Sequence, residues 1–238
     1  MPSLRAVRRS VPFDAGFAAR HPLFWPLEPA ARAFAASQTW PPVASWNALF
    51  AGVAPVEFVA AAPRPRRARK ASVDPSALYD ASITGRGVVP SRERHWHDFM
   101  NALVWATFPR AKAALHRRQG ALVAARIDPR APRLPAHRTR AQDGLAMIDE
   151  GGVVALVAPA REVPLVFGHA VYEGFVLGVR AMTARMVRLT VPSVDDDPLA
   201  QADGALAAAL AAADFSTLPE ALPRVFVPDD DAAPPWLR

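Results

Sequence analysis

The chain has 238 residues, of which 51% are hydrophobic and 21% are charged, a balance typical of a globular protein rather than of a disordered chain. It contains no cysteine, which excludes disulfides, thiolate nucleophiles and cysteine-based zinc or iron–sulfur sites. The net charge of +6 is unevenly distributed, since residues 1–140 hold 22 Lys and Arg against 8 Asp and Glu, whereas residues 141–238 hold 6 against 14.

The hydrophobic residues do not form a segment that would cross a membrane. No apolar run reaches the roughly 18–20 residues that a spanning helix needs. The first residues are basic and lack the apolar segment of a secretory signal. We therefore expect a cytoplasmic protein with no membrane span.

Residues 1–90 predict an irregular N-terminal part. Prolines break it into short helical pieces, and Trp25, Trp40 and Trp46 are expected to anchor them in the core. The β-branched and aromatic stretch at 56–60 predicts a strand. The proline- and arginine-rich stretch at 63–70 has the composition of a solvated loop.

Residues 91–214 predict the core. Apolar residues spaced by three and four, such as Trp96, Met100 and Leu103, indicate a helix over about 91–107, which Pro109 ends or kinks. A second, basic helix is expected over 111–126, followed by a proline-rich loop at 128–135.

The remaining elements include the strands. The alternating segment at 143–157 predicts a hairpin that turns at Gly151-Gly152, followed by a buried helix at 165–178 and a long strand at 179–191. Acidic residues 195–197 suit the start of an alanine-rich helix, and residues 215–238 read as an extended acidic tail. The fold class is therefore α+β: a mainly helical single domain with a small antiparallel sheet.

Three ordered motifs, HDFMNALVWATFPRAK, RTRAQDGLAMIDEGG and VFGHAVYEG, resemble the bacterial family called Domain of Unknown Function 3025. The likeness is strongest from about Tyr79 to Gly174. The residues that fit its pattern are His97, Asp98, Asn101, Phe108, Pro109, Arg110, Lys112, Asp143, Asp149, Glu150, Gly168, His169, Tyr172 and Glu173. Gln142 and Met100 depart from it, where arginine and an aromatic are expected. The resemblance implies which positions matter and transfers no activity.

The first motif offers two histidines and an asparagine. His95 and His97 would share a metal ion in an extended segment but diverge by about 200° in a helix, so the helical pattern argues against a shared ion. The alternative is that Asp98 caps the helix and leaves both histidines extended. His97 and Asn101, at i and i+4, lie together at the edge of the apolar face. They either bond to backbone as a structural network or form a site in which His97 is a ligand or general base.

The other two motifs add carboxylates and a histidine. His169 and Glu173 share one helical face, and Asp143 and Asp149 share one side of the predicted strand. If both helices converge on the hairpin, these residues could bind a divalent metal ion, with His97, Asp143, Asp149 and His169 as ligands. Glu150 is interpreted as part of a polar turn.

The function that these residues favour is metal-assisted or acid–base hydrolysis. The predicted catalytic residues are His97, Asp98, Asn101, Asp143, Asp149 and His169, with Arg110 and Lys112 placed for an anionic small substrate. Nucleophile-elbow and phosphate-loop motifs are absent.

The alternative function is non-enzymatic binding through a basic face. From Arg110 to Arg140 there are nine Lys and Arg and one acidic residue, Asp128, which suits nucleic acid or an acidic partner. The stretch has no aromatic residue to stack on bases. The same charges could instead pair with the protein's own acidic C-terminal third.

Overall fold

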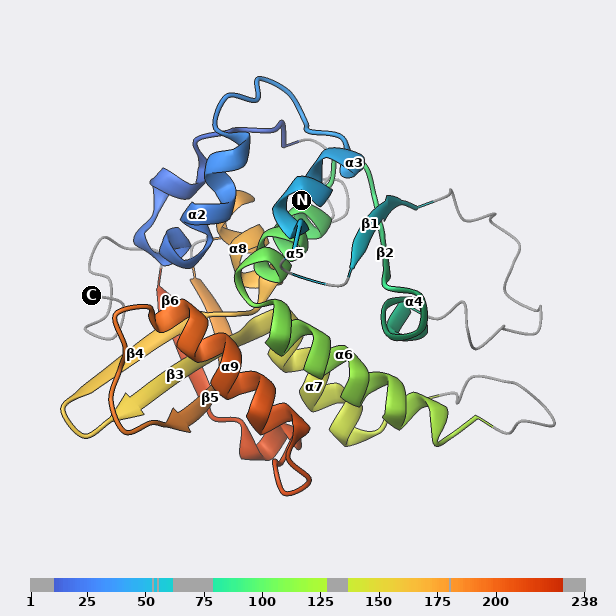
Figure 1. Ribbon diagram of the computed structural model, residues 1–238. Helices are drawn as coiled ribbons and strands as arrows, with labels where there is room; N and C mark the ends of the chain where they lie inside the picture. The colour runs from blue at the N-terminus through green and yellow to red at the C-terminus, as the bar shows by residue number, and fades with distance from the viewer. Residues whose placement is uncertain are drawn as a thin grey trace.

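The computed structural model describes residues 11–52, 54, 56–61, 79–127, 137–179 and 181–228. The loops predicted at 63–70 and 128–135 lie outside the described residues. The N-terminal part consists of short helices, as predicted, and Figure 1 shows them at the top of the molecule. They are η1 (Phe17–Arg20), η2 (Pro22–Leu27), α2 (Glu28–Ala31), η3 (Arg32–Phe34), α3 (Val43–Trp46) and η4 (Asn47–Phe50).

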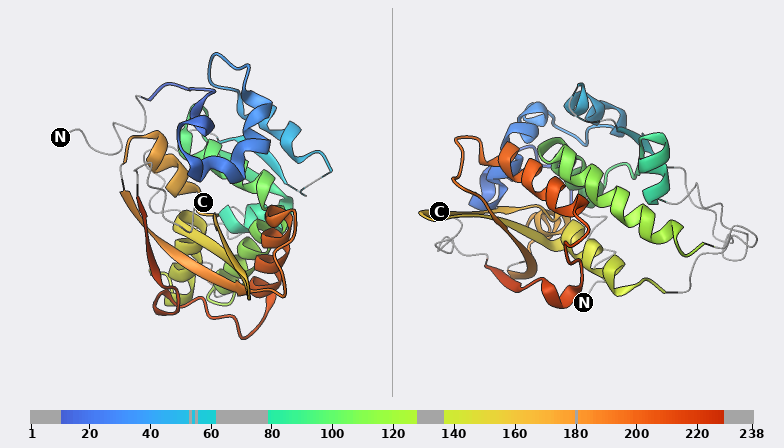
Figure 2. Two further views of the ribbon diagram at one scale, coloured as in Figure 1. Left: turned by 90° about the vertical axis from the view of Figure 1, so that its left-hand side faces the viewer. Right: turned by 60° about the horizontal axis from the view of Figure 1, so that its bottom comes forward.

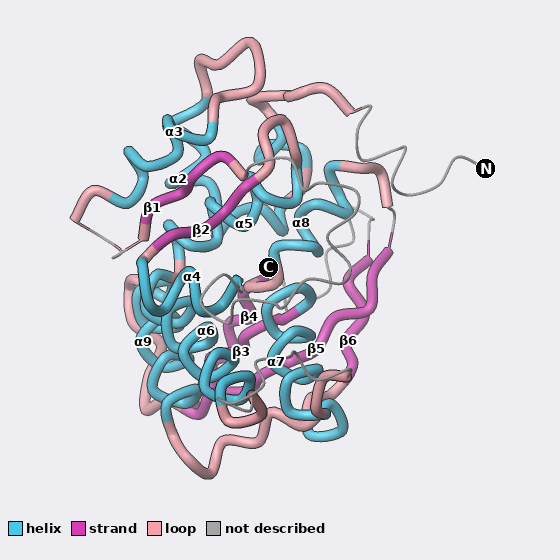
Figure 3. The backbone as a smooth tube through the Cα atoms, turned by 90° about the vertical axis from the view of Figure 1, so that its right-hand side faces the viewer, coloured by secondary structure: helices cyan, strands magenta, loops and turns pink. Residues whose placement is uncertain are grey.

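Aromatic contacts hold these short helices on the core. Trp46 is fully buried, and the Trp40 ring packs edge-on against Trp96 with 4.9 Å between centroids. A small two-stranded sheet follows, in which β1 (Glu57–Ala60) pairs in parallel with β2 (Val88–Ser91). The short helix α4 (Tyr79–Arg86) precedes β2, and Figure 3 shows this pair of strands apart from the larger sheet.

Two consecutive helices form the centre of the molecule. The helix α5 (Trp96–Thr107) buries Trp96, Met100 and Leu103, which confirms the face predicted from their spacing. The chain leaves the helical conformation at Phe108, and Pro109 begins α6 (Pro109–Ala124). A proline suits this place because the first residue of a helix has no intrahelical use for its N–H group.

The hairpin predicted at 143–157 is wrong in position. Residues up to 151 form a helix, α7 (Arg140–Gly151), and the hairpin lies further on, at 152–166. The helix starts with a capping box, in which Thr139 accepts a hydrogen bond from the Gln142 N–H and Gln142 accepts one from the Thr139 N–H. Gln142, a departure from the family pattern, thus has a structural role here that an uncharged side chain can fill.

The larger sheet has the strand order β4-β3-β5-β6. Its members are β3 (Gly152–Ala158), β4 (Arg161–Val166), β5 (Ala181–Thr190) and β6 (Arg224–Pro228). The strand predicted at 179–191 is confirmed as β5. The sheet is mixed rather than purely antiparallel, because β3 and β5 run parallel and the chain crosses between them through α8 (His169–Val176).

Helices cover the sheet. In Figures 1 and 2, α9 (Pro198–Ala211) crosses the sheet, and it contacts β3 and β4, while α7 contacts β5. The turn η7 (Pro219–Ala221) precedes β6. The predicted fold class, a mainly helical α+β protein, is confirmed. None of the helices in the described part of the chain is long and apolar enough to cross a membrane.

Candidate functional site

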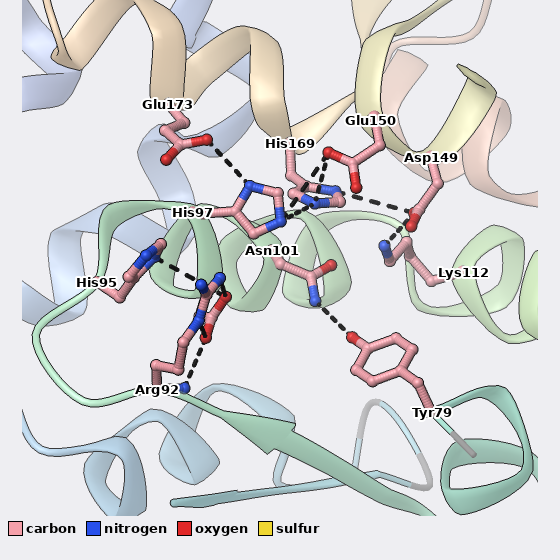
Figure 4. Close-up of polar contacts among 11 residues, drawn as sticks. Tyr79, Arg92, His95, His97, Asn101, Lys112, Asp149, Glu150, His169 and Glu173 are labelled. Carbon is pink, nitrogen blue, oxygen red and sulfur yellow. Dashed lines mark hydrogen bonds and ion pairs between the residues drawn. The ribbon is translucent and has the colours of Figure 1, made fainter. Parts of the chain in front are cut away.

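Three helix ends bring two histidines and a glutamate together. His97 lies in the first turn of α5, His169 is the first residue of α8, and Glu150 lies in the last turn of α7. The Nε2 atoms of the two histidines are 3.1 Å apart. Glu150 Oε2 lies 3.5 Å from Nε2 of His169 and 3.9 Å from Nε2 of His97. Figure 4 shows the three side chains pointing toward one another, and this triangle could hold a metal ion.

A close backbone crossing fixes two of these helix ends. Gly168, directly before His169, donates its N–H to the carbonyl of Gly152, two residues after Glu150. A Cβ atom on Gly168 would lie 2.4 Å from the Gly152 nitrogen and 2.6 Å from the Glu150 carbonyl oxygen. Since real Cβ atoms do not approach so closely, only glycine permits this contact. The glycine therefore sets the separation between Glu150 and His169.

A carboxylate lies beside the Nδ1 atom of each histidine. Glu173, on the next turn of α8 after His169, bonds to Nδ1 of His97 at 3.0 Å and is almost fully buried. Asp149 Oδ1 lies 3.9 Å from Nδ1 of His169. The hydrogen bond with Glu173 favours a proton on Nδ1 of His97, which leaves the Nε2 lone pair of that ring directed at His169 and Glu150. Nδ1 of His169 is buried and has no hydrogen-bond partner among the described residues.

Lys112 is fully buried and forms an ion pair with Asp149. Its ammonium group also lies 5.8 Å from the centre of the Trp105 ring and 5.9 Å from that of Phe167. A buried ammonium group needs such partners, because the interior solvates charge poorly. The charge of Lys112 is thus already compensated within the protein.

The surroundings raise the pKa values of His97 and Glu150. Burial lowers the pKa of His97, but the hydrogen bond with Glu173 and the charge of Glu150 outweigh it, and the net pKa lies above the ordinary value. Burial also raises the pKa of Glu150, against the opposing charge of His97.

The pKa values of His169 and Asp149 are lowered instead. Burial lowers the pKa of His169 to about 3, since the opposing charge of Asp149 does not compensate and Lys112 adds to the effect. Burial of Asp149 would raise its pKa, but the positive charge of Lys112 holds it well below the ordinary value. His169 is therefore neutral at pH 7, the state in which imidazole binds metal.

Asn101 lies one turn after His97 and is nearly buried, at 6% exposure. Its Nδ2 atom donates to the Tyr79 hydroxyl at 3.1 Å, whereas its Oδ1 atom is buried and has no hydrogen-bond partner among the described residues. Figure 4 shows the amide between the histidine pair and Tyr79. Burial, together with the charge of Asp149, raises the pKa of Tyr79, so its hydroxyl is protonated.

Asp98 points to a different partner. Both of its oxygens bind the Arg92 side chain, at 2.7 and 2.8 Å, and one also accepts the backbone N–H of Arg92 at 2.6 Å. His95 is the N-cap residue of α5, so the helix begins one residue after it, and its Nδ1 atom lies 4.0 Å from Asp98. Asp98 thus clamps the loop before α5, and the alternative in which it caps the helix is wrong.

Besides Asp98, two further predicted residues, Asp143 and Arg110, lie outside the cluster. Asp143 is on α7, about 10 Å along the axis before Glu150, and the two line a shallow hollow together with Met147. Arg110 lies two residues before Lys112 on α6, where side chains diverge by about 200°. It lines a separate hollow of about 660 Å³ near α9, together with Asp203.

Sequence reasoning missed Glu150 and Tyr79. Glu150 was interpreted as a turn residue because 143–157 was predicted as a hairpin, and on a strand Asp149 and Glu150 would point to opposite sides. The Thr139-x-x-Gln142 capping box was the signal that could have revealed the helix. No local pattern could reveal Tyr79, since it contacts Asn101 only through tertiary structure.

The fold and the cluster define a mainly helical α+β protein with a half-buried histidine–carboxylate site. The model of the family described as "Protein of unknown function (DUF3025)" matches residues 67–164, which confirms the resemblance predicted from the sequence motifs. The matched segment includes His97, Asn101, Lys112, Asp149 and Glu150 and ends before His169. No curated protein matches the chain, and no solved structure matches it.

Proposed function

We propose that the protein is a metal-dependent hydrolase in which His97, His169 and Glu150 bind one divalent metal ion. The observation that carries this proposal is the triangle of two Nε2 atoms and one carboxylate oxygen, with edges of 3.1, 3.5 and 3.9 Å. Ligand atoms about 2.0–2.1 Å from a tetrahedral zinc ion lie roughly 3.3 Å apart. Small side-chain adjustments would complete such a site.

The carboxylates next to the triangle support this proposal. A histidine that binds metal through Nε2 commonly donates its other N–H to a carboxylate, as His97 does with Glu173. Without a metal ion, two neutral rings that both carry the proton on Nδ1 would oppose their Nε2 lone pairs at 3.1 Å. A cation bound between the two Nε2 atoms would remove that repulsion.

Three protein ligands leave a coordination position for water. A divalent metal ion held by these three ligands would lower the pKa of such a water molecule toward 7 and would supply a nucleophile at neutral pH. Glu150 is half exposed, so the proposed site is open to solvent on this side. A cytoplasmic location remains part of this proposal.

A second candidate function follows from the same 3.1 Å contact. The histidines could share a proton, with cationic His97 donating to neutral His169, and act as an acid–base pair without metal. The raised pKa of His97 and the lowered pKa of His169 favour this arrangement in metal-free protein.

The basic-face alternative gains less support. Arg118 donates to the carbonyls of Leu210, Ala212 and Phe215, and Arg140 pairs with Glu220. Both arginines are thus engaged by the acidic C-terminal third of the same chain. Nucleic-acid binding by this face stays a prediction, with salt-dependent retention of RNA or DNA as its test.

Metal analysis of protein purified without a histidine tag tests the proposal. We expect about one zinc or similar ion per chain, lost in His97→Ala and His169→Ala and weakened in Glu150→Gln. His95→Ala is the matched control, because His95 lies two residues from His97 and outside the triangle. Circular dichroism checks that each variant is folded.

Two results would contradict the metal proposal. One is wild-type protein that holds no metal after incubation with zinc, cobalt or manganese. The other is an equal loss of metal in His95→Ala. In the first case the metal-free histidine pair becomes the better candidate.

A further inference from the structure

A neutral hydrogen-bonding pair lies next to the triangle. The Oδ1 atom of Asn101 is buried and lacks a partner among the described residues. The Tyr79 hydroxyl accepts a hydrogen bond from Asn101, and no described residue accepts its own proton. The pair therefore offers one free acceptor and one free donor. A buried acceptor such as Asn101 Oδ1 is rarely left unmatched unless a ligand or water meets it. Tyr79 is 39% exposed, so its hydroxyl is not held to the same rule.

The pair and the triangle belong to one site. Asn101 follows His97 by one turn of α5, which places their Cβ atoms about 5–6 Å apart. In Figure 4 the Asn101 amide lies between the histidine pair and Tyr79, with Lys112 and Asp149 to one side. A molecule bound at the triangle would thus meet the amide.

The charges around the site do not suit an anionic substrate. Lys112 is already paired with Asp149, and Arg110 lines a different hollow. Three carboxylates, those of Asp149, Glu150 and Glu173, surround the histidines. Together with Lys112 and a divalent cation, these groups sum to a neutral site, which gives no free positive charge for a phosphate or carboxylate.

We propose that the substrate is a carboxamide, with its N–H donated to Asn101 Oδ1 and its carbonyl oxygen facing the metal position and the Tyr79 hydroxyl. This inference rests on the proposed function. A primary carboxamide carries a donor on nitrogen and an acceptor on oxygen, both bonded to the carbonyl carbon, and one of its N–H groups points to the same side as the oxygen. This matches the free acceptor and donor of the pair. An ester lacks the N–H, and a phosphate ester would direct its oxygens at the Asn101 carbonyl.

The reaction consumes water and needs no other co-reactant. The oxygen of a water molecule forms a bond to the carbonyl carbon, and the C–N bond breaks. The nitrogen leaves with the electron pair of that bond and takes up a proton from the water. The products are a carboxylic acid and an amine, so atoms and electrons balance.

Ligand binding to cobalt-loaded protein tests the inference. The visible spectrum of cobalt(II) changes when a ligand enters its coordination sphere, so binding can be titrated without a known substrate. Acetohydroxamate carries an N–H beside two chelating oxygens, and N-methylacetohydroxamate keeps the oxygens without the N–H. We expect the methylated compound to bind about tenfold more weakly, the effect of one lost buried hydrogen bond. Methylphosphonate should bind more weakly than acetohydroxamate.

Variants assign the effect to the two side chains. In Asn101→Leu the difference between the two hydroxamates should disappear, because the acceptor is gone. Tyr79→Phe should weaken both hydroxamates by a similar factor of several. Tyr172→Phe is the matched control, since the hydroxyl of Tyr172 donates to the Val166 carbonyl and lies outside the pair; it should leave both affinities unchanged.

Each failure has a distinct signature. Protein that binds no cobalt or zinc overturns the proposed function and this inference together. Protein that binds cobalt but prefers methylphosphonate, or that binds both hydroxamates equally well, overturns the amide inference and leaves the metal site standing. Retention of the tenfold difference in Asn101→Leu overturns the role of Asn101.

Discussion

Within the described residues, two histidines form a hydrogen bond with a carboxylate through Nδ1, and the two pairs differ in what surrounds the Nε2 atom. His97 bonds to Glu173 at 3.0 Å, between α5 and α8, and His116 bonds to Asp80 at 2.9 Å, between α6 and α4. Both imidazoles are partly or fully buried. By the carboxylate contact alone, the two pairs are equivalent.

The two pairs differ in the surroundings of the histidine Nε2 atom. Nε2 of His97 faces the Nε2 atom of His169 and the carboxylate of Glu150. Nε2 of His116 is buried without a hydrogen-bond partner among the described residues. The imidazole ring stacks on the Trp105 ring, with 5.5 Å between ring centroids and an angle of 2° between the ring planes. A carboxylate that orients an imidazole therefore does not make a site by itself. Convergence of further donor atoms, and access from solvent, distinguish the first pair.

Substitution of a glycine should have the largest effect. We expect Gly168→Ala to lower the free energy of unfolding by more than about 3 kcal/mol, since the new Cβ would overlap backbone on the α7 side. Gly85→Ala in α4, next to the other pair, is the control. A Cβ there meets no atom within 4 Å, and the change should be neutral or stabilise by up to about 1 kcal/mol. Equal urea midpoints for the two variants would show that the glycine crossing is not required.

Substitution of the buried Lys112 should cause the second-largest loss of stability. Lys112→Met removes the partner of Asp149 and should cost about 3 kcal/mol, the usual effect of leaving one member of a buried ion pair. His116→Gln, one turn later on α6, keeps an amide that can donate to Asp80 and should cost about 1 kcal/mol. Urea unfolding measures both. The ranking fails if His116→Gln is the more damaging change.

The acid response should identify His169. In metal-free protein its pKa is about 3 folded, against an ordinary 6.5. Between pH 6.5 and pH 3 this histidine is protonated more in the unfolded chain than in the folded protein, so the free energy of unfolding decreases as the pH falls. We expect a loss of about 1 kcal/mol between pH 6 and pH 5 that His169→Gln abolishes.

His97 should behave in the opposite way. Because the pKa of His97 is higher in the folded protein than in the unfolded chain, protonation of His97 stabilises the fold at low pH. This stabilisation is lost as the pH rises through the pKa of the folded state. His97→Gln should therefore steepen the decline in acid. Unfolding curves across pH 5 to 8 would test both variants, and identical profiles for wild type and His169→Gln would contradict the assignment.

The smallest effect should come from the loop before α5. The Arg92 side chain is 54% exposed, so its ion pair with Asp98 is screened by water. Arg92→Ala should cost only about 0.5–1 kcal/mol and should leave metal content unchanged. A loss of metal in this variant would mean that the loop, and not only the glycine crossing, positions His97.

Local periodicity was enough to predict several elements. The spacing of Trp96, Met100 and Leu103 placed α5, and the alternation near 179–191 placed β5. Those patterns arise because one face of each element is buried along its whole length. Residues 143–151 have a short apolar face that also fits alternation, and there the capping box at Thr139 and Gln142 was the better guide.

The candidate site was predictable only in part. His97, Asn101 and His169 share helical faces with their motif neighbours, so their importance could be inferred from spacing. Glu150 could not be separated from Asp149 without knowing that the segment is helical, because a helix turns adjacent side chains about 100° apart. That rotation directs Asp149 to Lys112 and Glu150 to the histidines.

By itself, the sequence determined the fold class, the absence of thiol chemistry and the residues that carry polar chemistry within apolar helices. Tertiary structure decided which of these residues meet. His97 and His169 are 72 positions apart in the chain, and the backbone contact at Gly168 sets the position of Glu150 beside His169. Periodicity reports which side of an element is buried, whereas the packing of helix ends depends on contacts between segments that no local pattern contains.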